Sequence, residues 1–127
     1  MSRPTYSEFE AACSFLKRYG VSAIDIMQKS QVPDEVFKDD TAKGVISTVG
    51  RIVLPSSIAH VIVYMYDKEL ESLYTRHLSR QRKRVFDRNA YERDAIKVRD
   101  KYDAIEAFYV EQAKKVYDKE GTTLQPA

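Results

Sequence analysis

Few residues in this sequence have the types and spacing that enzyme chemistry requires. The two histidines, His60 and His77, have no Cys or carboxylate beside them at the spacing of a metal-binding motif. Ser56 and Ser57 lack the flanking glycines of a nucleophile elbow, and none of the four glycines stands in a phosphate-binding motif. We therefore expect no catalytic activity, no cofactor and no metal ion.

Binding chemistry has one candidate in the sequence, a cluster of basic side chains in residues 76–88, where Asp87 is the only acidic residue. The cluster has three interpretations: a solvated helix face, a stripe that neutralises nucleic-acid phosphates, or the inner flank of a membrane span. Its members are Arg76, Arg80, Arg82, Lys83, Arg84 and Arg88.

Length and composition bound the class of protein. A chain of 127 residues suffices for one domain with a single core, and 43% hydrophobic residues indicate that it folds. Twenty-one Lys and Arg against nineteen Asp and Glu leave a net charge of only +2, so no global field favours nucleic acid or acidic lipid. The lone Cys13 cannot form an internal disulfide, and its apolar neighbours predict a small buried side chain. We expect an intracellular, reducing setting.

The N-terminal part, residues 1–43, predicts short helices joined by tight turns. Thr5 with Glu8, or Ser7 with Glu10, offers a capping box at the start of the first helix. A glycine then marks the end of this helix, and a serine and a proline mark the starts of the next two. The expected helices are a first that ends at Gly20, a second from Ser22 to Met27, and a third from Pro33 to Lys38 after a turn at Gln31 and Val32.

Residues 22–40 resemble a helix-turn-helix. In this resemblance Ile26 and Met27 face inward from the first helix, Gln31 makes the turn, and Val32 and Phe37 face inward from the second. The resemblance implies a nucleic-acid-binding regulator that also uses the basic helix 76–88. The would-be recognition helix, however, carries acidic residues that repel phosphates, and two packed helices are the simpler interpretation. These residues are Asp34, Glu35, Asp39 and Asp40.

An apolar segment, residues 44–66, follows and is rich in Val and Ile. As one helix it would be about 34 Å long, enough to cross a hydrocarbon core of about 30 Å. One interpretation is therefore a single transmembrane helix, with Tyr64 and Tyr66 in the aromatic belt. The basic cluster would then place the C-terminus on the inner side of the membrane.

Two other interpretations of residues 44–66 stay open, because Arg51, His60 and Pro55 are each costly in lipid. The segment can form one buried helix, or two buried strands from Ile46 to Leu54 and from His60 to Met65. We expect Arg51 and His60 to be intramembrane or buried polar residues that need partners.

Residues 67–120 predict a long, charged helical arm, since they contain no Pro or Gly. In its last part apolar residues recur at three- and four-residue intervals, a heptad pattern flanked by charges of both signs. The pattern is rich in Tyr and lacks Leu, which favours packing on another helix of a complex over self-driven dimerisation. We call it the heptad seam and expect it to bind a partner through Tyr91, Val98, Tyr102, Ile105, Tyr109 and Val116. The tail, residues 121–127, should be loose.

These patterns favour an all-α protein with short N-terminal helices, a central apolar segment and a long C-terminal helix. The function that they predict is positional: a non-catalytic structural or assembly subunit that binds other protein subunits of a larger complex. A single-span accessory subunit of a respiratory or ATP-synthase-type complex fits, in the mitochondrial inner membrane or another energy-transducing membrane, as does a soluble component of a virion. The alternative is the soluble nucleic-acid-binding regulator.

Overall fold

A computed structural model describes residues 3–39, 45–46, 52–80 and 85–120 of the chain. These residues form five helices and one small antiparallel sheet, so the prediction of an all-α protein is confirmed. The elements are α1 (Tyr6–Lys17), α2 (Ala23–Met27), α3 (Asp34–Asp39), β1 (Val45–Ile46), β2 (Val53–Leu54), α4 (Ser56–Arg80) and α5 (Arg88–Glu120).

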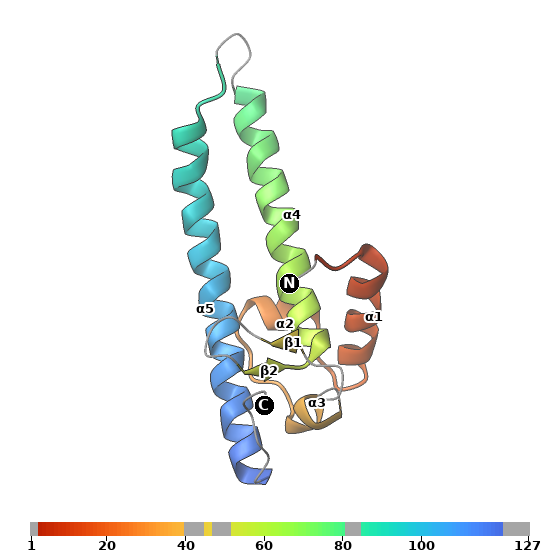
Figure 1. The fold of residues 1–127 in the computed structure, drawn as a ribbon. Coiled ribbons are helices and arrows are strands. Elements are labelled where there is room, and N and C mark those ends of the chain that lie inside the picture. The colour runs from red at the N-terminus through yellow and green to blue at the C-terminus, as the bar shows by residue number, and fades with distance from the viewer. Residues whose placement is uncertain (1–2, 40–44, 47–51, 81–84, 121–127) are drawn as a thin grey trace.

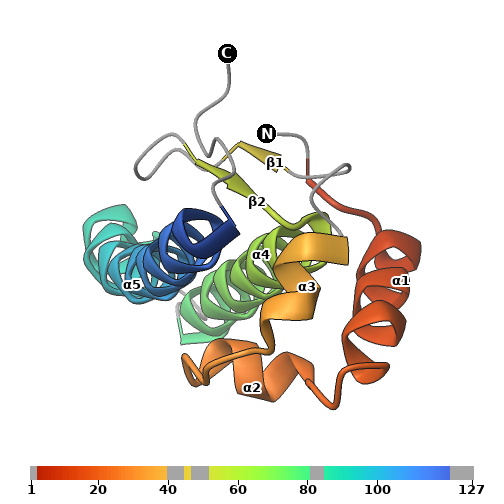
Figure 2. The ribbon, with the colours of Figure 1, turned by 90° about the horizontal axis from the view of Figure 1, so that it is seen from below.

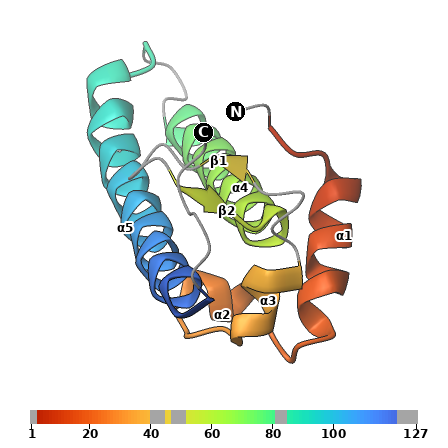
Figure 3. The same cartoon turned by 60° about the horizontal axis from the view of Figure 1, so that its bottom comes forward.

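The two longest helices, α4 and α5, run antiparallel and side by side as a hairpin (Figure 1). α1 packs along α4 on the side away from α5, and α2 and α3 lie beneath them at the base (Figures 2 and 3). The smaller elements therefore surround only one end of the hairpin. We call these elements and that end of the hairpin the body. The other end, residues 66–80 and 85–99, extends beyond the body, and we call it the distal hairpin (Figure 1).

The core of the body lies around the first turns of α4. Ile58 and Val61 are fully buried there, and each N-terminal helix adds a fully buried side chain, Leu16, Ile26 or Phe37. Burial of a side chain of this size stabilises a fold by about 1.5–3 kcal/mol. The body is therefore the part of the molecule in which the hydrophobic stabilisation is concentrated.

The N-terminal helices begin and end close to where the sequence predicts. The Thr5 hydroxyl accepts the backbone N–H of Glu8 at 3.2 Å, and the Glu8 carboxylate accepts the N–H of Thr5 at 3.0 Å, so the first of the two candidate capping boxes forms. Ser22 and Asp25 form the same reciprocal pair at the start of α2. Gly20 has φ 75°, a left-handed conformation that glycine adopts at little cost, and the chain turns there after α1.

The turn between α2 and α3 comes earlier than predicted. It lies at Lys29, whose φ is 56°, and not at Gln31 and Val32. The backbone N–H of Ser30 bonds to the carbonyl of Asp25 at 3.0 Å and closes the end of α2. A turn in this conformation is usually marked by glycine, because another residue costs about 1 kcal/mol or more there. Here the residue is lysine, so the sequence does not mark the turn.

In the described part of this segment, residues 45–46 and 52–66, the chain forms neither one helix nor a strand from His60 to Met65, so both of these predictions are wrong. The predicted strand from Ile46 to Leu54 lies partly outside the described residues. β1 and β2 have two residues each, and His60–Met65 belong to α4. The reason is Pro55, which disfavours a helical conformation at Leu54 but suits a helix start. Its carbonyl accepts the N–H of Ala59 at 3.1 Å, at the beginning of α4. The strands pair Val45 with Leu54 and Ile46 with Val53. Among the described residues, none of the helices combines the length and the hydropathy of a membrane span.

The predicted continuous arm over residues 67–120 is also wrong, because the chain reverses between α4 and α5. α4 ends at Arg80, and residues 85–87 are not helical. The Asp87 carboxylate caps α5 by accepting the N–H of Ala90 at 3.1 Å. Phe86, just before this cap, contacts Tyr91 with ring centroids 5.8 Å apart, which is a hydrophobic staple. A cap and a staple therefore start a new helix without any Pro or Gly.

Candidate interaction site on the distal hairpin

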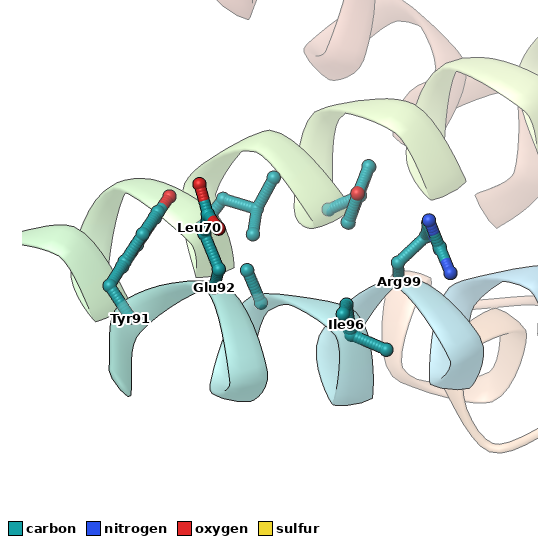
Figure 4. Close-up of a pocket in the computed structure, with 7 residues that line it drawn as sticks. Leu70, Tyr91, Glu92, Ile96 and Arg99 are labelled. Atoms are coloured by element: carbon teal, nitrogen blue, oxygen red, sulfur yellow. The ribbon is translucent and has the colours of Figure 1, made fainter. Parts of the chain in front are cut away.

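The distal hairpin carries a groove between α4 and α5, with a volume of about 300 Å³. Leu70 projects from α4 beside Tyr91 and Glu92 of α5, and Ile96 and Arg99 follow along α5 (Figure 4). The other lining residues are Tyr66 and Ala95. An apolar surface flanked by one acidic and one basic side chain is suited to packing against another protein.

Exposed apolar side chains are concentrated on the same part of the molecule. Ile96 is 48% exposed at the groove, Leu78 is 47% exposed on α4, and Val85 between the helices is 91% exposed. In the body, the large apolar side chains that stand out in this way are Tyr6 and Ile24. A cluster of such residues marks a contact surface more strongly than scattered single ones do.

A group of rings holds the outer ends of α4 and α5 together. Tyr74 contacts Phe86 and Tyr91, with ring centroids 5.2 and 5.4 Å apart. His77 is buried beside them, and its Nε2 lies 2.9 Å from a carboxylate oxygen of Asp94. Because an ionised carboxylate only accepts, the imidazole donates from this nitrogen. The rings and the His77–Asp94 bond therefore fix the relative position of the two helices beside the groove.

Charges on α5 reach the groove. Burial raises the pKa of Tyr66, the Asp103 carboxylate raises it further, and the Arg99 guanidinium acts in the opposite direction. Both charged groups are thus close enough to the Tyr66 hydroxyl to influence it. Asp103 follows Arg99 by four residues, which places it on the same face of α5 as the groove residues, although it does not line the groove.

The basic cluster of residues 76–88 is only partly described. Outside the described part lie Arg82, Lys83 and Arg84 and the side chain of Arg80. Arg76 is exposed on α4. Arg88 is exposed at the start of α5, where its Nε lies 2.9 Å from the Glu92 carboxylate. One of the two described cations is therefore paired within its own helix.

The structure places the heptad seam against the chain's own elements. Tyr91 lies in the ring cluster, and Val98 is half-buried against the core. The other four residues are buried, Tyr102, Ile105, Tyr109 and Val116. We expected this seam to bind a partner subunit, but in the fold the surface that it packs on is supplied by the same chain.

Two polar side chains of α5 hold the segment between α2 and α3. The Tyr109 hydroxyl lies 2.8 Å from the carbonyl oxygen of Ser30. The Gln112 amide donates to the carbonyl of Val32 at 2.6 Å and accepts the N–H of the same residue at 3.4 Å. Buried backbone groups outside regular structure need such partners. These bonds tie the N-terminal helices to the hairpin.

His60 and Arg51 were expected to be intramembrane or buried polar residues. Arg51 lies outside the described residues. His60 is half-buried on α4, with its Nε2 3.9 Å from the Glu8 carboxylate of α1. The capping hydrogen bonds with Thr5 hold the pKa of Glu8 below its ordinary value, so the carboxylate facing His60 is ionised at neutral pH.

Cys13 lies half-buried on α1 and packs against the core. Burial raises the pKa of its thiol, and the charge of Glu10 raises it further. A thiol with a raised pKa stays protonated at neutral pH and is a poor nucleophile. Cys13 therefore acts as a small apolar side chain.

The unit that resembles a helix-turn-helix consists of packed helices. Ile26, Val32 and Phe37 are buried, as the sequence predicts. α3 has only six residues and contacts α5, and the Asp34 carboxylate lies 3.9 Å from Nζ of Lys119. The first turn of α3 is acidic, which disfavours approach to phosphates.

Two features of the site were missed in the sequence. The start of α5 is encoded by Phe86, Asp87 and Tyr91, a staple and cap that a search for helix starts could have found. The charges of Glu92 and Arg99 on either side of Ile96 could also have been recognised in the sequence. Only the hairpin shows that this part of α5 faces outward along a groove.

The fold and the groove define a class: a small helical protein with a stable body and a projecting hairpin that offers a contact surface. In the ranges that the structure describes, no three His, Cys, Asp or Glu side chains lie close enough to hold a metal ion. Comparison of the chain with protein-family models, with curated proteins and with solved structures finds no match.

Replacing His77 with Ala should loosen the distal hairpin and leave the body intact. The change removes a buried ring and its bond to Asp94, at an expected local cost of about 1–3 kcal/mol. Hydrogen exchange should therefore accelerate in residues 70–80 and 88–98, while residues 105–117 keep their protection. The exposed neighbour Thr75, changed to Ala, serves as the control. Equal acceleration in both regions would contradict a separately stable body.

Proposed function

We propose that the protein is a non-catalytic structural subunit of a larger multiprotein assembly and that its distal hairpin binds the neighbouring subunit. One observation carries the proposal: the distal hairpin combines a groove with exposed apolar side chains, among them Leu78, Val85 and Ile96. Exposed apolar side chains on a projecting part of a molecule cost solubility unless another surface covers them.

The division between body and distal hairpin supports this function. The hairpin is anchored at its base by the buried part of the heptad seam, Tyr102, Ile105, Tyr109 and Val116. The ring cluster and the His77–Asp94 bond hold its outer end. A surface that is already ordered loses little conformational entropy on binding, so more of the contact energy appears as affinity.

A nucleic-acid-binding function has less support. Phosphate binding requires a surface of one sign, whereas Glu92 and Arg99 alternate along the groove, and Arg88 is paired with Glu92. The mixed charges are more typical of the rim of a protein–protein interface.

Photo-crosslinking in cells that express the protein tests the proposal. A photoreactive phenylalanine analogue at position 96 should link the chain to its neighbour in the assembly, because Ile96 lies at the groove. The same analogue at position 97 is the matched control, since Lys97 is exposed and does not line the groove. Equal crosslinking from both positions, or none from position 96 in cells, would contradict the proposal.

A further inference from the structure

The face of α5 that borders the groove carries charged residues in a self-complementary order. When a second copy of the helix runs antiparallel to the first, each basic position faces an acidic one. From the N-terminal end the order is basic, acidic, apolar, basic, acidic. The spacings of four, four, three and four residues place all five positions on one face of a helix. The residues are Arg88, Glu92, Ile96, Arg99 and Asp103.

The structure puts this stripe on the exposed groove side. Glu92, Ile96 and Arg99 line the groove. Asp103 lies one helical turn beyond Arg99 on the same face of α5. Arg88, with 82% of its side chain exposed, pairs with Glu92. All five residues are exposed, so another molecule can reach the whole stripe.

We propose that a second copy of this chain docks on the groove face, with the two α5 helices antiparallel about a two-fold axis that passes between Ala95 and Ile96. The inference rests on the proposed function and names the partner of the same surface. Closed two-fold pairing, in which each copy uses the same patch, is the commonest form of self-association among soluble proteins.

Antiparallel pairing about this axis brings opposite charges together. Arg88 and Asp103 lie equally far on either side of the axis, so each faces the other residue in the second copy. Glu92 and Arg99 are related in the same way. Ile96 falls at the centre and meets the apolar part of the second groove. A parallel arrangement would place Glu92 against Glu92 and Arg99 against Arg99, which is unfavourable.

The charges select orientation and register, while apolar contact supplies the affinity. In the single chain Arg88 bonds to Glu92 at 2.9 Å, and Arg99 lies 3.7 Å from Asp100. Exposed ion pairs contribute little free energy, so exchanging these for contacts across the axis changes the free energy of association little. Burial of Ile96 and Leu70 is what favours association.

The size of the surface predicts a weak dimer. The stretch from Arg88 to Asp103 is about 24 Å long, and two adjacent helices over that length offer on the order of 500 Å² per copy. A stable interface of standard size buries about 800 Å² per partner. We therefore expect dissociation constants between about 10 µM and about 1 mM.

Sedimentation equilibrium of the purified full chain, from about 10 µM to about 1 mM, tests the inference. The average mass should rise from 14.7 kDa toward twice that value. Glu92→Arg puts like charges together at two symmetry-related positions and should weaken association at least about tenfold. Arg99→Glu should do the same. The double variant, Glu92→Arg with Arg99→Glu, restores opposite charges across the axis and should recover affinity to within about threefold of the wild type.

Lys97→Glu is the matched control, because it reverses a charge on an exposed side of α5 away from the groove. Circular dichroism checks that each variant keeps its helices. A mass that stays at 14.7 kDa at every concentration overturns the inference. So does a double variant as weakly associating as Glu92→Arg alone, or a Lys97→Glu variant that is equally impaired.

The two proposals fail in different ways. If the purified chain is monomeric but position 96 crosslinks in cells to a different protein, the self-association is overturned and the proposed function stands. If the purified chain dimerises with the expected charge dependence but position 96 gives no crosslink in cells, the self-association stands and the proposed function is overturned.

Discussion

Replacing Tyr109 with Ala should lower the free energy of unfolding by about 3–5 kcal/mol. The ring is fully buried at the junction of α5 with the N-terminal helices, and it packs edge-on against Phe108. Its hydroxyl lies 2.8 Å from the carbonyl of Ser30 and 3.2 Å from that of Ile26. A small domain has only about 5–15 kcal/mol of stability, so this is a large fraction of the total. Urea unfolding followed by circular dichroism measures the loss.

The hydroxyl and the ring can be separated. Tyr109→Phe keeps the ring but removes the hydroxyl donor to the Ser30 carbonyl, which should cost about 1–2 kcal/mol. Tyr6→Phe is the matched control, since Tyr6 is 60% exposed and the same change should stay within about 0.5 kcal/mol. If Tyr109→Phe is as stable as the wild type, the contact of α5 with residues 26–30 is not held by this hydrogen bond.

Alkaline pH should destabilise the protein steeply. Burial raises the pKa of Tyr102, and the hydrogen bond to Glu69 and the charge of that carboxylate raise it further. Burial and the charge of Asp25 raise the pKa of Tyr109. The unfolded chain loses these protons near pH 10, whereas the folded chain keeps them. The stabilisation is therefore complete below about pH 10 and is lost as the pH rises above that value.

The expected slope is about 1.4 kcal/mol per pH unit for each tyrosine that only the folded state keeps protonated, or about 2.7 kcal/mol for Tyr102 and Tyr109 together. Unfolding free energies at pH 9, 10, 11 and 12, for wild type and for a variant with both tyrosines changed to Phe, measure it. The double variant should lose most of this slope. An unchanged slope would mean that other groups cause the alkaline unfolding.

The two groups of variants should separate stability from binding. Tyr109 and Gln112 lie in the body and affect the free energy of unfolding. Glu92, Ile96 and Arg99 lie on the exposed groove face, where substitutions change stability little. A variant on that face that loses its partner while keeping its stability therefore reports on the interface itself.

Local features were predictable where a short stretch of chain is enough to satisfy its own polar groups. The capping box of Thr5 and Glu8 needs only four consecutive residues, and Gly20 needs only its own freedom to take a positive φ. The burial of Ile26 in α2 and of Phe37 in α3 likewise agrees with helical spacing.

The errors concern features that depend on contacts distant in sequence. Residues 44–66 left a membrane helix, a buried helix and two strands open, because hydropathy does not distinguish a membrane span from a buried segment; in the fold Pro55 separates strand β2 from helix α4. The arm over residues 67–120 lacks Pro and Gly, yet packing of Phe86, Tyr74 and Tyr91 stabilises a reversal within it. Local propensity cannot show such packing, because the rings come from two helices.

The sequence by itself determined a helical protein, the start of its first helix and the existence of an apolar seam on α5, since these follow from periodicity and from hydrogen bonds between near neighbours. The tertiary structure decided which surface that seam meets. Folding back of α4 buries Tyr102 and Tyr109 within the chain, because burying a large ring internally is more favourable than leaving it in water. The same fold leaves Glu92, Ile96 and Arg99 outside, and it thereby decides which face of α5 remains for a partner.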